Sequence, residues 1–154
     1  MCKINEVIQC IAAFLGCFGF SFVFRIHKNI RFAFIGSLVG TIGWIIYLST
    51  DFLDNSFFQT FLAMLCVSLS SEMLARLYKA PATIFVMVGC FPLVPGSGIY
   101  YTMLYAVQGL NNLFVESFLE TLGIGFAIAL AILFSLTLFQ IYKRIKAKDY
   151  APIE

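Results

Sequence analysis

Apolar residues in this chain occur in long continuous runs rather than in alternating or amphipathic patterns. Five runs can be distinguished, at 4–24, 32–50, 57–75, 82–109 and 118–142. A helix needs about 20 apolar residues to cross a hydrocarbon core about 30 Å thick, and most of the runs are close to that length. The linkers of about six to eight residues must join antiparallel neighbours. The pattern therefore predicts an all-α membrane protein with five transmembrane helices.

Composition supports the membrane assignment and excludes several other classes. The 154 residues are 61% hydrophobic and 12% charged, against roughly 25% charged in soluble domains. We expect one transmembrane domain, 1–142, followed by a basic cytoplasmic tail, 143–154. No phosphate-binding loop, nucleophile elbow or dinucleotide fingerprint occurs in the sequence. The sequence therefore predicts no enzyme, no catalytic residue, no cofactor and no nucleic-acid partner.

The cysteines indicate neither a disulfide framework nor a metal site. There are five, without a CxxC spacing, and His27 is the one histidine available to assist them. Most lie inside apolar runs, where a cysteine behaves as a small hydrophobic residue. We expect buried free thiols and a solvated His27. The cysteines are Cys2, Cys10, Cys17, Cys66 and Cys90.

The distribution of basic residues predicts the orientation in the membrane. Nine of the ten lie in the first linker, in the third linker or after the last run, namely Arg25, Lys28, Arg31, Arg76, Lys79, Lys143, Arg144, Lys146 and Lys148. The second linker instead carries Asp51 and Asp54, and Glu116 and Glu120 at the outer end of the fifth run are expected to be hydrated. Because positive loops stay in the cytoplasm, the N-terminus is predicted outside and the C-terminus inside the cell membrane.

Five helices with opposed termini resemble half of a transporter. Alternating access commonly uses two repeats or bundles, and no internal repeat supplies the second one here. The missing half would be a second copy or a different polypeptide. Gly36, Gly40 and Gly43 give the second run a small-residue surface for close helix contact, for which packing within the chain is the favoured interpretation.

The fourth run is interrupted by the segment FPLVPGSGIYY. Pro92 and Pro95 remove backbone donors, while Gly96 and Gly98 permit dihedral angles closed to other residues. Counting along the run places this cluster near the bilayer centre. Irregular backbone at that depth is tolerated where it is buried in protein or lines a watery cavity. The sequence therefore predicts a helix that is broken there.

The break has the order of a new helix start, which points to an anion site. The N–H groups of Ser97, Gly98 and Ile99, with the positive end of a half-helix dipole, would face the break and attract a carboxylate. Hydroxyl groups of Ser97, Tyr100 or Tyr101 would assist. A simple kink that shapes the bundle is the alternative. The predicted substrate-binding or gating residues are Pro92, Pro95, Gly96, Ser97, Gly98, Tyr100 and Tyr101.

Glu72 is an ionisable residue inside the third run, and such residues are functional candidates. Arg76 lies four residues later, on the same helical face, so the two could form an ion pair near the cytoplasmic boundary. Proton coupling or gating is the competing interpretation. Both residues therefore enter the candidate list, as a coupling site or as an ion pair.

Two segments, SSEMLARLYKAP and GCFPLVPGSGIYYTMLY, resemble the threonine/serine exporter family, specifically its C-terminal half. That half also occurs as a small separate membrane subunit, and the resemblance covers about residues 5–145. The resemblance implies export of threonine and serine or of dicarboxylates such as succinate. It also implies a larger partner subunit with its own helices.

Together these observations predict a subunit of a secondary transporter that exports small carboxylate-bearing metabolites across the cell membrane. The driving force is unassigned. A homo-oligomeric channel for small solutes, with the PLVPGSG segment as its constriction, is one alternative. A scaffold that supports a larger subunit without transporting is the other, although a scaffold does not require an interrupted helix.

Overall fold

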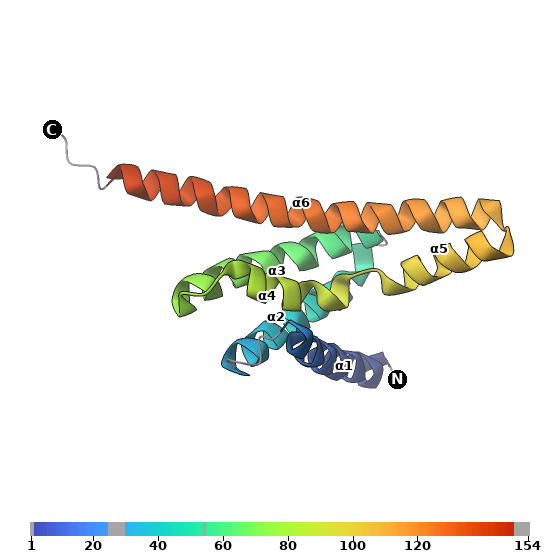
Figure 1. Ribbon diagram of the computed structural model, residues 1–154, viewed down its shortest axis with the longest axis horizontal. Helices are drawn as coiled ribbons and strands as arrows, with labels where there is room; N and C mark the ends of the chain where they lie inside the picture. The colour runs from blue at the N-terminus through green and yellow to red at the C-terminus, as the bar shows by residue number, and fades with distance from the viewer. Residues whose placement is uncertain (1, 25–29, 54, 150–154) are drawn as a thin grey trace.

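The computed structural model describes residues 2–24, 30–53 and 55–149, and within these ranges it contains helices and no strand. Figure 1 shows the arrangement of the helices. In chain order they are α1 (Cys2–Val23), α2 (Ile30–Ser49), the 3₁₀ turn η2 (Asp51–Leu53), α3 (Ser56–Tyr78), α4 (Ala82–Cys90), the 3₁₀ turn η3 (Phe91–Leu93), α5 (Gly96–Gln108) and α6 (Asn111–Asp149). The predicted all-α class is confirmed for the described residues.

Four of these helices are long and apolar enough to cross a membrane: Asn5–Val23, Ile30–Ser49, Ser56–Tyr78 and Asn111–Tyr142. A fifth candidate consists of Ala82–Leu93 and Gly96–Gln108, which meet at an angle of 56°. The described residues therefore contain four candidate spans, or five if the bent pair crosses as one. This agrees with the predicted multi-pass membrane protein and with the predicted break in its fourth segment.

The boundaries of the last helices differ from the prediction. The expected linker before residue 118 is helical, because α6 begins at Asn111. The actual turn is Gly109–Leu110, where Gly109 has a φ of 70° and Leu110 N donates to Tyr105 O at 3.0 Å. Glycine adopts this left-handed conformation without a Cβ penalty and ends α5 abruptly. The polar residues Asn111, Asn112 and Glu116 interrupt the apolar run, which is why a linker was expected there. A helix can nevertheless continue beyond the hydrocarbon core, where its polar residues reach water.

The third linker is also shorter than expected. α3 continues to Tyr78 and ends at Lys79, whose φ is 49° and whose N–H donates to Ala75 O. At its start, the side chain of Asn55 accepts a hydrogen bond from Phe57 N at 3.1 Å and caps the helix. α3 and α4 are therefore joined by a tight turn.

The small residues of α2 pack within the chain, as favoured from the sequence. A Cβ on Gly36 would lie 3.2 Å from Val88 of α4, and one on Gly40 would lie 2.6 Å from the Cys17 sulfur of α1. Such contacts leave no room for a side chain, so α1 and α4 approach the α2 backbone closely. The buried hydrophobic cluster beside this seam consists of Val39, Ala63, Met64, Val67, Leu93 and Ala131.

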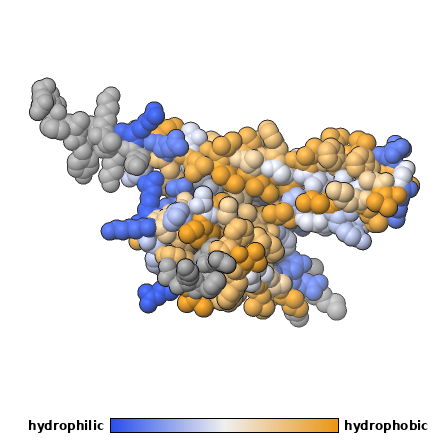
Figure 2. Space-filling view, in the orientation of Figure 1, coloured by the Kyte–Doolittle hydropathy of each residue, from blue (hydrophilic) through white to orange (hydrophobic). Residues whose placement is uncertain are grey.

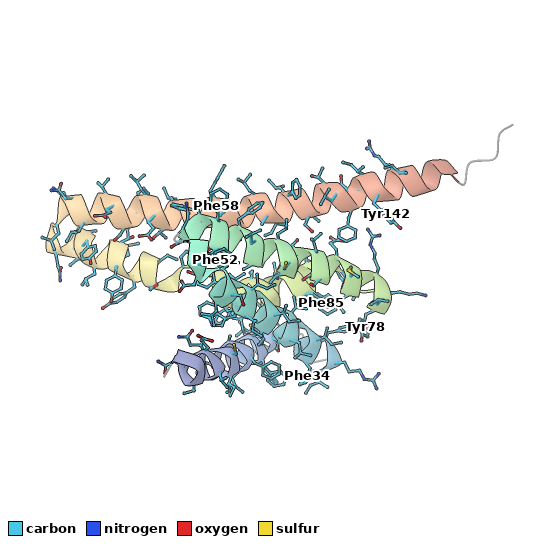
Figure 3. The ribbon with its side chains drawn as sticks, turned by 180° about the vertical axis from the view of Figure 1, so that it is seen from behind. Phe34, Phe52, Phe58, Tyr78, Phe85 and Tyr142 are labelled. Atoms are coloured by element: carbon cyan, nitrogen blue, oxygen red, sulfur yellow. The ribbon has the colours of Figure 1, made fainter. Side chains whose placement is uncertain are left out.

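Aromatic side chains divide between this interior and the outer surface (Figure 3). Phe85 of α4 is fully buried and packs edge-on against Phe32 of α2. Phe58 of α3 and Tyr142 of α6 are exposed and point away from the bundle. An apolar outer surface is what a helix bundle presents to lipid.

α5 and α6 form a hairpin that extends away from the other helices (Figure 1). α5 packs on α6, while α6 packs on both α5 and α3. With 39 residues, α6 is about 58 Å long at a rise of 1.5 Å per residue, well beyond a hydrocarbon core of about 30 Å. α6 therefore projects past the bundle at both of its ends.

Hydrophilic residues gather at the ends of the molecule, with apolar surface between them (Figure 2). Arg76 of α3 lies over the Phe139 ring of α6, at 4.5 Å from its centroid, and Phe32 of α2 packs against Tyr78 of α3. These contacts bring Arg31, Arg76, Lys79 and Arg144 to one end. Which side of the membrane this end faces stays a prediction. Arg25, His27, Lys28, Asp54 and positions 150–154 lie outside the described residues.

Candidate functional site

The break between α4 and α5 leaves two backbone donors free. Gly96 N donates to Val94 O at 2.8 Å, and Ile99 N donates to Pro95 O at 3.1 Å, which starts the helical pattern of α5. Within the described structure, the N–H groups of Ser97 and Gly98 have no acceptor. The predicted donor set of three therefore reduces to two, because Ile99 already makes its helical bond.

The two glycines at the break do not have the conformation expected of them. Positive φ occurs at Lys79 and Gly109 among the described residues, and neither Gly96 nor Gly98 shares it. Gly98 instead permits close packing, since a Cβ there would lie 2.5 Å from Thr121 Oγ1 of α6. A Cβ on Gly96 would meet open space. Gly98 is therefore a packing position between α5 and α6, and a valine there would disturb the hairpin.

Beside the break lies a cavity of about 300 Å³. The end of α2, the start of α3, the start of α5 and the outer part of α6 enclose it, so four of the eight described helical segments contribute no lining residue. Its lining consists of Tyr47, Ser56, Pro95, Ser97, Gly98, Tyr101, Tyr105, Ser117, Glu120, Thr121 and Ile124. Hydroxyl groups, free backbone donors and one carboxylate thus share a single space, unlike the aromatic and aliphatic lining of the pocket between Phe57 and Leu130.

The structure brings together some of the predicted site residues and separates others. Pro95, Ser97, Gly98 and Tyr101 line the cavity, whereas Gly96 and the exposed Tyr100 do not. Pro92 lies on a different cavity, of about 240 Å³, between α1, α2 and η3. Four of the seven predicted residues thus share one cavity, and their role in substrate binding or gating stays a prediction.

Seven lining residues were not predicted, and four of them come from α6. Ser117, Glu120, Thr121 and Ile124 recur at intervals of three and four, which is one face of a helix. That spacing could have identified these residues from the sequence as one face of a helix. It was missed because the fifth helix was expected to begin at 118, which left Ser117 outside the helix. Glu120 is exposed, as expected, and it also lines the cavity beside α5.

Two threonine hydroxyl groups of the hairpin have their protons engaged. Thr121 Oγ1, which lines the cavity, donates to Ser117 O at 2.7 Å within α6, and Thr102 Oγ1, which does not line it, donates to Gly98 O at 2.7 Å within α5. These bonds hold the hairpin side chains in place and leave oxygen lone pairs available. The N–H groups of Ser97 and Gly98, whose residues line the cavity, lack an acceptor in the described structure. Glu120 is the charged residue among the lining side chains.

The cavity is not level with the middle of the bundle. Tyr47 lies in the last turn of α2, and Ser56 is the first residue of α3. Gly89 of α4 is instead level with the middle of α3, since a Cβ on it would lie 2.8 Å from Val67. Counting along the fourth run predicted residue 95 at the centre. The difference arises because α5 continues beyond the ends of α2 and α3 as part of the hairpin.

Glu72 and Arg76 do not form an ion pair in this structure. Arg76 places its guanidinium over the Phe139 ring of α6, a cation–π contact, rather than toward Glu72. Glu72 is half-buried on α3. Within the described ranges, no cluster of three His, Cys, Asp or Glu side chains is placed to hold a metal ion.

Comparison with known proteins places this architecture in a family. The family model described as Threonine/Serine exporter, ThrE, matches residues 9–138, which include every residue that lines the cavity as well as Glu72. No curated protein and no solved structure matches the chain. Since the family model covers most of the sequence and the fold is a multi-pass helical bundle, the chain belongs to the threonine/serine exporter family.

Proposed function

We propose that this chain is a subunit of a secondary transporter that exports threonine or serine across the cell membrane, with the substrate bound in the cavity at the start of α5. The observation that carries the proposal is the pair of free N–H groups at Ser97 and Gly98 beside that cavity. They lie at the positive end of the α5 dipole, which favours a carboxylate. A discontinuous helix is a common substrate site in secondary transporters.

Glu120 favours an amino acid over a dicarboxylate. Its carboxylate lines the same cavity as the α5 N-terminus, so a zwitterion can direct its carboxylate to Ser97 and its ammonium group to Glu120. Succinate would bring a second negative charge toward Glu120. The substrate hydroxyl of threonine or serine would find acceptors in the tyrosine and serine oxygens. A volume of about 300 Å³ is sufficient for such a small molecule.

The proposed assembly includes a second membrane component, either a larger subunit of the same family or another copy of this chain. α5 packs on α6, and much of its surface, including Tyr100, Met103 and Val107, is exposed. A substrate site at the edge of a bundle needs a facing bundle to alternate its access. This supports the C-terminal-half type of subunit that the sequence resemblance implies.

Counterflow of L-threonine tests the transport proposal. Membrane vesicles from cells that express the chain, loaded with unlabelled L-threonine and diluted into labelled L-threonine, should accumulate label transiently above its equilibrium level. A channel would fill the vesicles only to equilibrium, and a scaffold would give the same time course as vesicles that lack the chain. Either of these results, obtained both with the chain alone and with a larger subunit of the same family co-expressed, would reject the exporter.

A further inference from the structure

Two buried hydroxyl groups between α3 and α6 lack hydrogen-bond partners. Ser68 Oγ and Ser135 Oγ belong to side chains that are 1% and 0% exposed, and neither atom has a partner in the described structure. Neighbouring buried hydroxyl groups behave differently: Ser71 Oγ donates to Val67 O at 2.7 Å, and Ser37 Oγ donates to Ala33 O at 2.7 Å. Since nearly all buried polar atoms in proteins are paired, Ser68 and Ser135 require a partner of their own.

Both hydroxyl groups lie in one seam. Ser68 is on the side of α3 that carries Phe57 and Phe61, which line a pocket against α6. Ser135 continues the buried stripe of α6 formed by Ala127 and Ala131, one residue per turn. α6 packs against α3 and α5, and α5 lies at the far end, so α3 covers Ser135.

The register of the two helices brings Glu72 to the same place. α3 and α6 run parallel, because Gly123 approaches Phe57 near the start of α3 and Phe139 approaches Arg76 near its end. By that register Ser135 lies level with the turn of α3 between Ser68 and Glu72. Glu72 follows Ser68 by four residues, so the two side chains share a face.

Glu72 lies at the rim of this seam without a described partner. It is half-buried, and no hydrogen bond or ion pair joins it to another described residue. The charged side chains described toward this end of the surrounding elements are Arg76 on its own helix, Lys79 directly after it, Arg144 on α6 and Arg31 at the start of α2. Glu116 and Glu120 of α6 lie at the opposite end of that helix. α6 also carries Lys143, whose side chain is not described, and α4 contributes no charged residue.

We propose that Ser68 and Ser135 form a proton-binding site with Glu72. The Glu72 carboxylate takes a proton from hydronium and releases water, and the neutral carboxyl enters the seam. Its O–H then donates to Ser68 Oγ, while the Ser135 hydroxyl donates to its carbonyl oxygen. The charged form is kept at the rim, because an ionised carboxylate pays a large desolvation cost inside an apolar interface.

This site would make α3–α6 packing depend on protonation. α6 also carries Ser117, Glu120 and Thr121 of the cavity, so a shift of α6 against α3 would reach the substrate site. The proposal that Glu72 binds a proton does not depend on the proposed function, whereas the coupling of that proton to export rests on it. The experiment described next is made without substrate, so it can reject proton binding without testing the exporter.

Infrared spectroscopy of the purified chain in lipid nanodiscs, titrated with acid, tests the site. We expect a carbonyl band of a protonated carboxylic acid that Glu72→Gln removes. In Ser68→Ala and Ser135→Ala the band should persist but move to higher wavenumber, because the carboxyl group then loses one of its two hydrogen bonds. Ser71→Ala is the matched control, since Ser71 bonds within its own helix, and should leave the band at its wild-type position.

Two results would overturn the proposal. If Glu72→Gln folds and retains every protonation band, Glu72 is not the proton acceptor. If the band belongs to Glu72 but neither serine variant moves it relative to Ser71→Ala, the seam does not receive the carboxyl group. Should Glu72→Gln fail to fold, the serine variants decide alone, because they keep the titrating residue.

Discussion

Replacement of Ser97 by proline is expected to weaken L-threonine binding by about tenfold to a hundredfold. Proline removes the Ser97 N–H, and a hydrogen bond to a charged group contributes about 1.5–3 kcal/mol. The first turn of a helix tolerates proline because its N–H groups have no helical acceptor there. Ser97 lies in that first turn, two residues after Pro95. The measurement is isothermal titration calorimetry of the purified full chain.

Ser97→Ala is the matched control for this change. Alanine removes the hydroxyl group but keeps the N–H, so its affinity for L-threonine should stay within about twofold of the wild type. Succinate should lose affinity in Ser97→Pro as well, because both substrates present a carboxylate. If Ser97→Pro is helical, monodisperse and binds L-threonine normally, the start of α5 is not the carboxylate site.

Replacement of Glu120 by glutamine should change substrate preference. We expect L-threonine to bind about fivefold more weakly, because its ammonium group loses a charged partner, and the exposure of Glu120 to solvent keeps the effect small for a charge-assisted bond. Succinate should bind more tightly, since a repulsive charge is removed. Competition between labelled L-threonine and succinate measures both.

Glu116→Gln provides the comparison for Glu120→Gln. Glu116 lies on the same helix and is exposed, but it does not line the cavity. Its replacement should leave the ratio of the two affinities unchanged. An equal effect of both variants would mean that the general charge of α6 matters rather than a contact at Glu120. A parallel loss of L-threonine and succinate binding in Glu120→Gln would contradict the ammonium assignment.

The parts of the fold that were predictable follow from the membrane. Hydrocarbon thickness requires long apolar runs, so α1, α2 and α3 could be recognised from length and composition alone. Pro92 and Pro95 remove backbone donors wherever they occur, which made the break between α4 and α5 predictable as well. The same holds for Gly36 and Gly40, whose lack of a side chain favours close packing.

The helix ends and the cavity depend on contacts that a single run of sequence does not specify. Hydropathy predicts where a helix leaves the hydrocarbon core. α6 extends beyond that point at its start, because its first residue is Asn111. The hairpin of α5 and α6 then pairs Gly98 with Thr121 and brings Glu120 to the cavity. The spacing of Glu72 and Arg76 permits an ion pair, but the Arg76 guanidinium instead lies over the ring of Phe139 on α6.

The most direct measurement is the response of individual backbone amides to substrate. In ¹⁵N-labelled chain in nanodiscs, L-threonine should shift the amide signals of Ser97 and Gly98 and leave that of Gly109, at the opposite end of α5, unchanged. L-Threoninol, which keeps the ammonium and hydroxyl groups but lacks the carboxylate, should not produce the shift. If L-threonine leaves Ser97 and Gly98 unchanged while it shifts other amides, or if L-threoninol shifts them equally, the carboxylate does not bind at the start of α5.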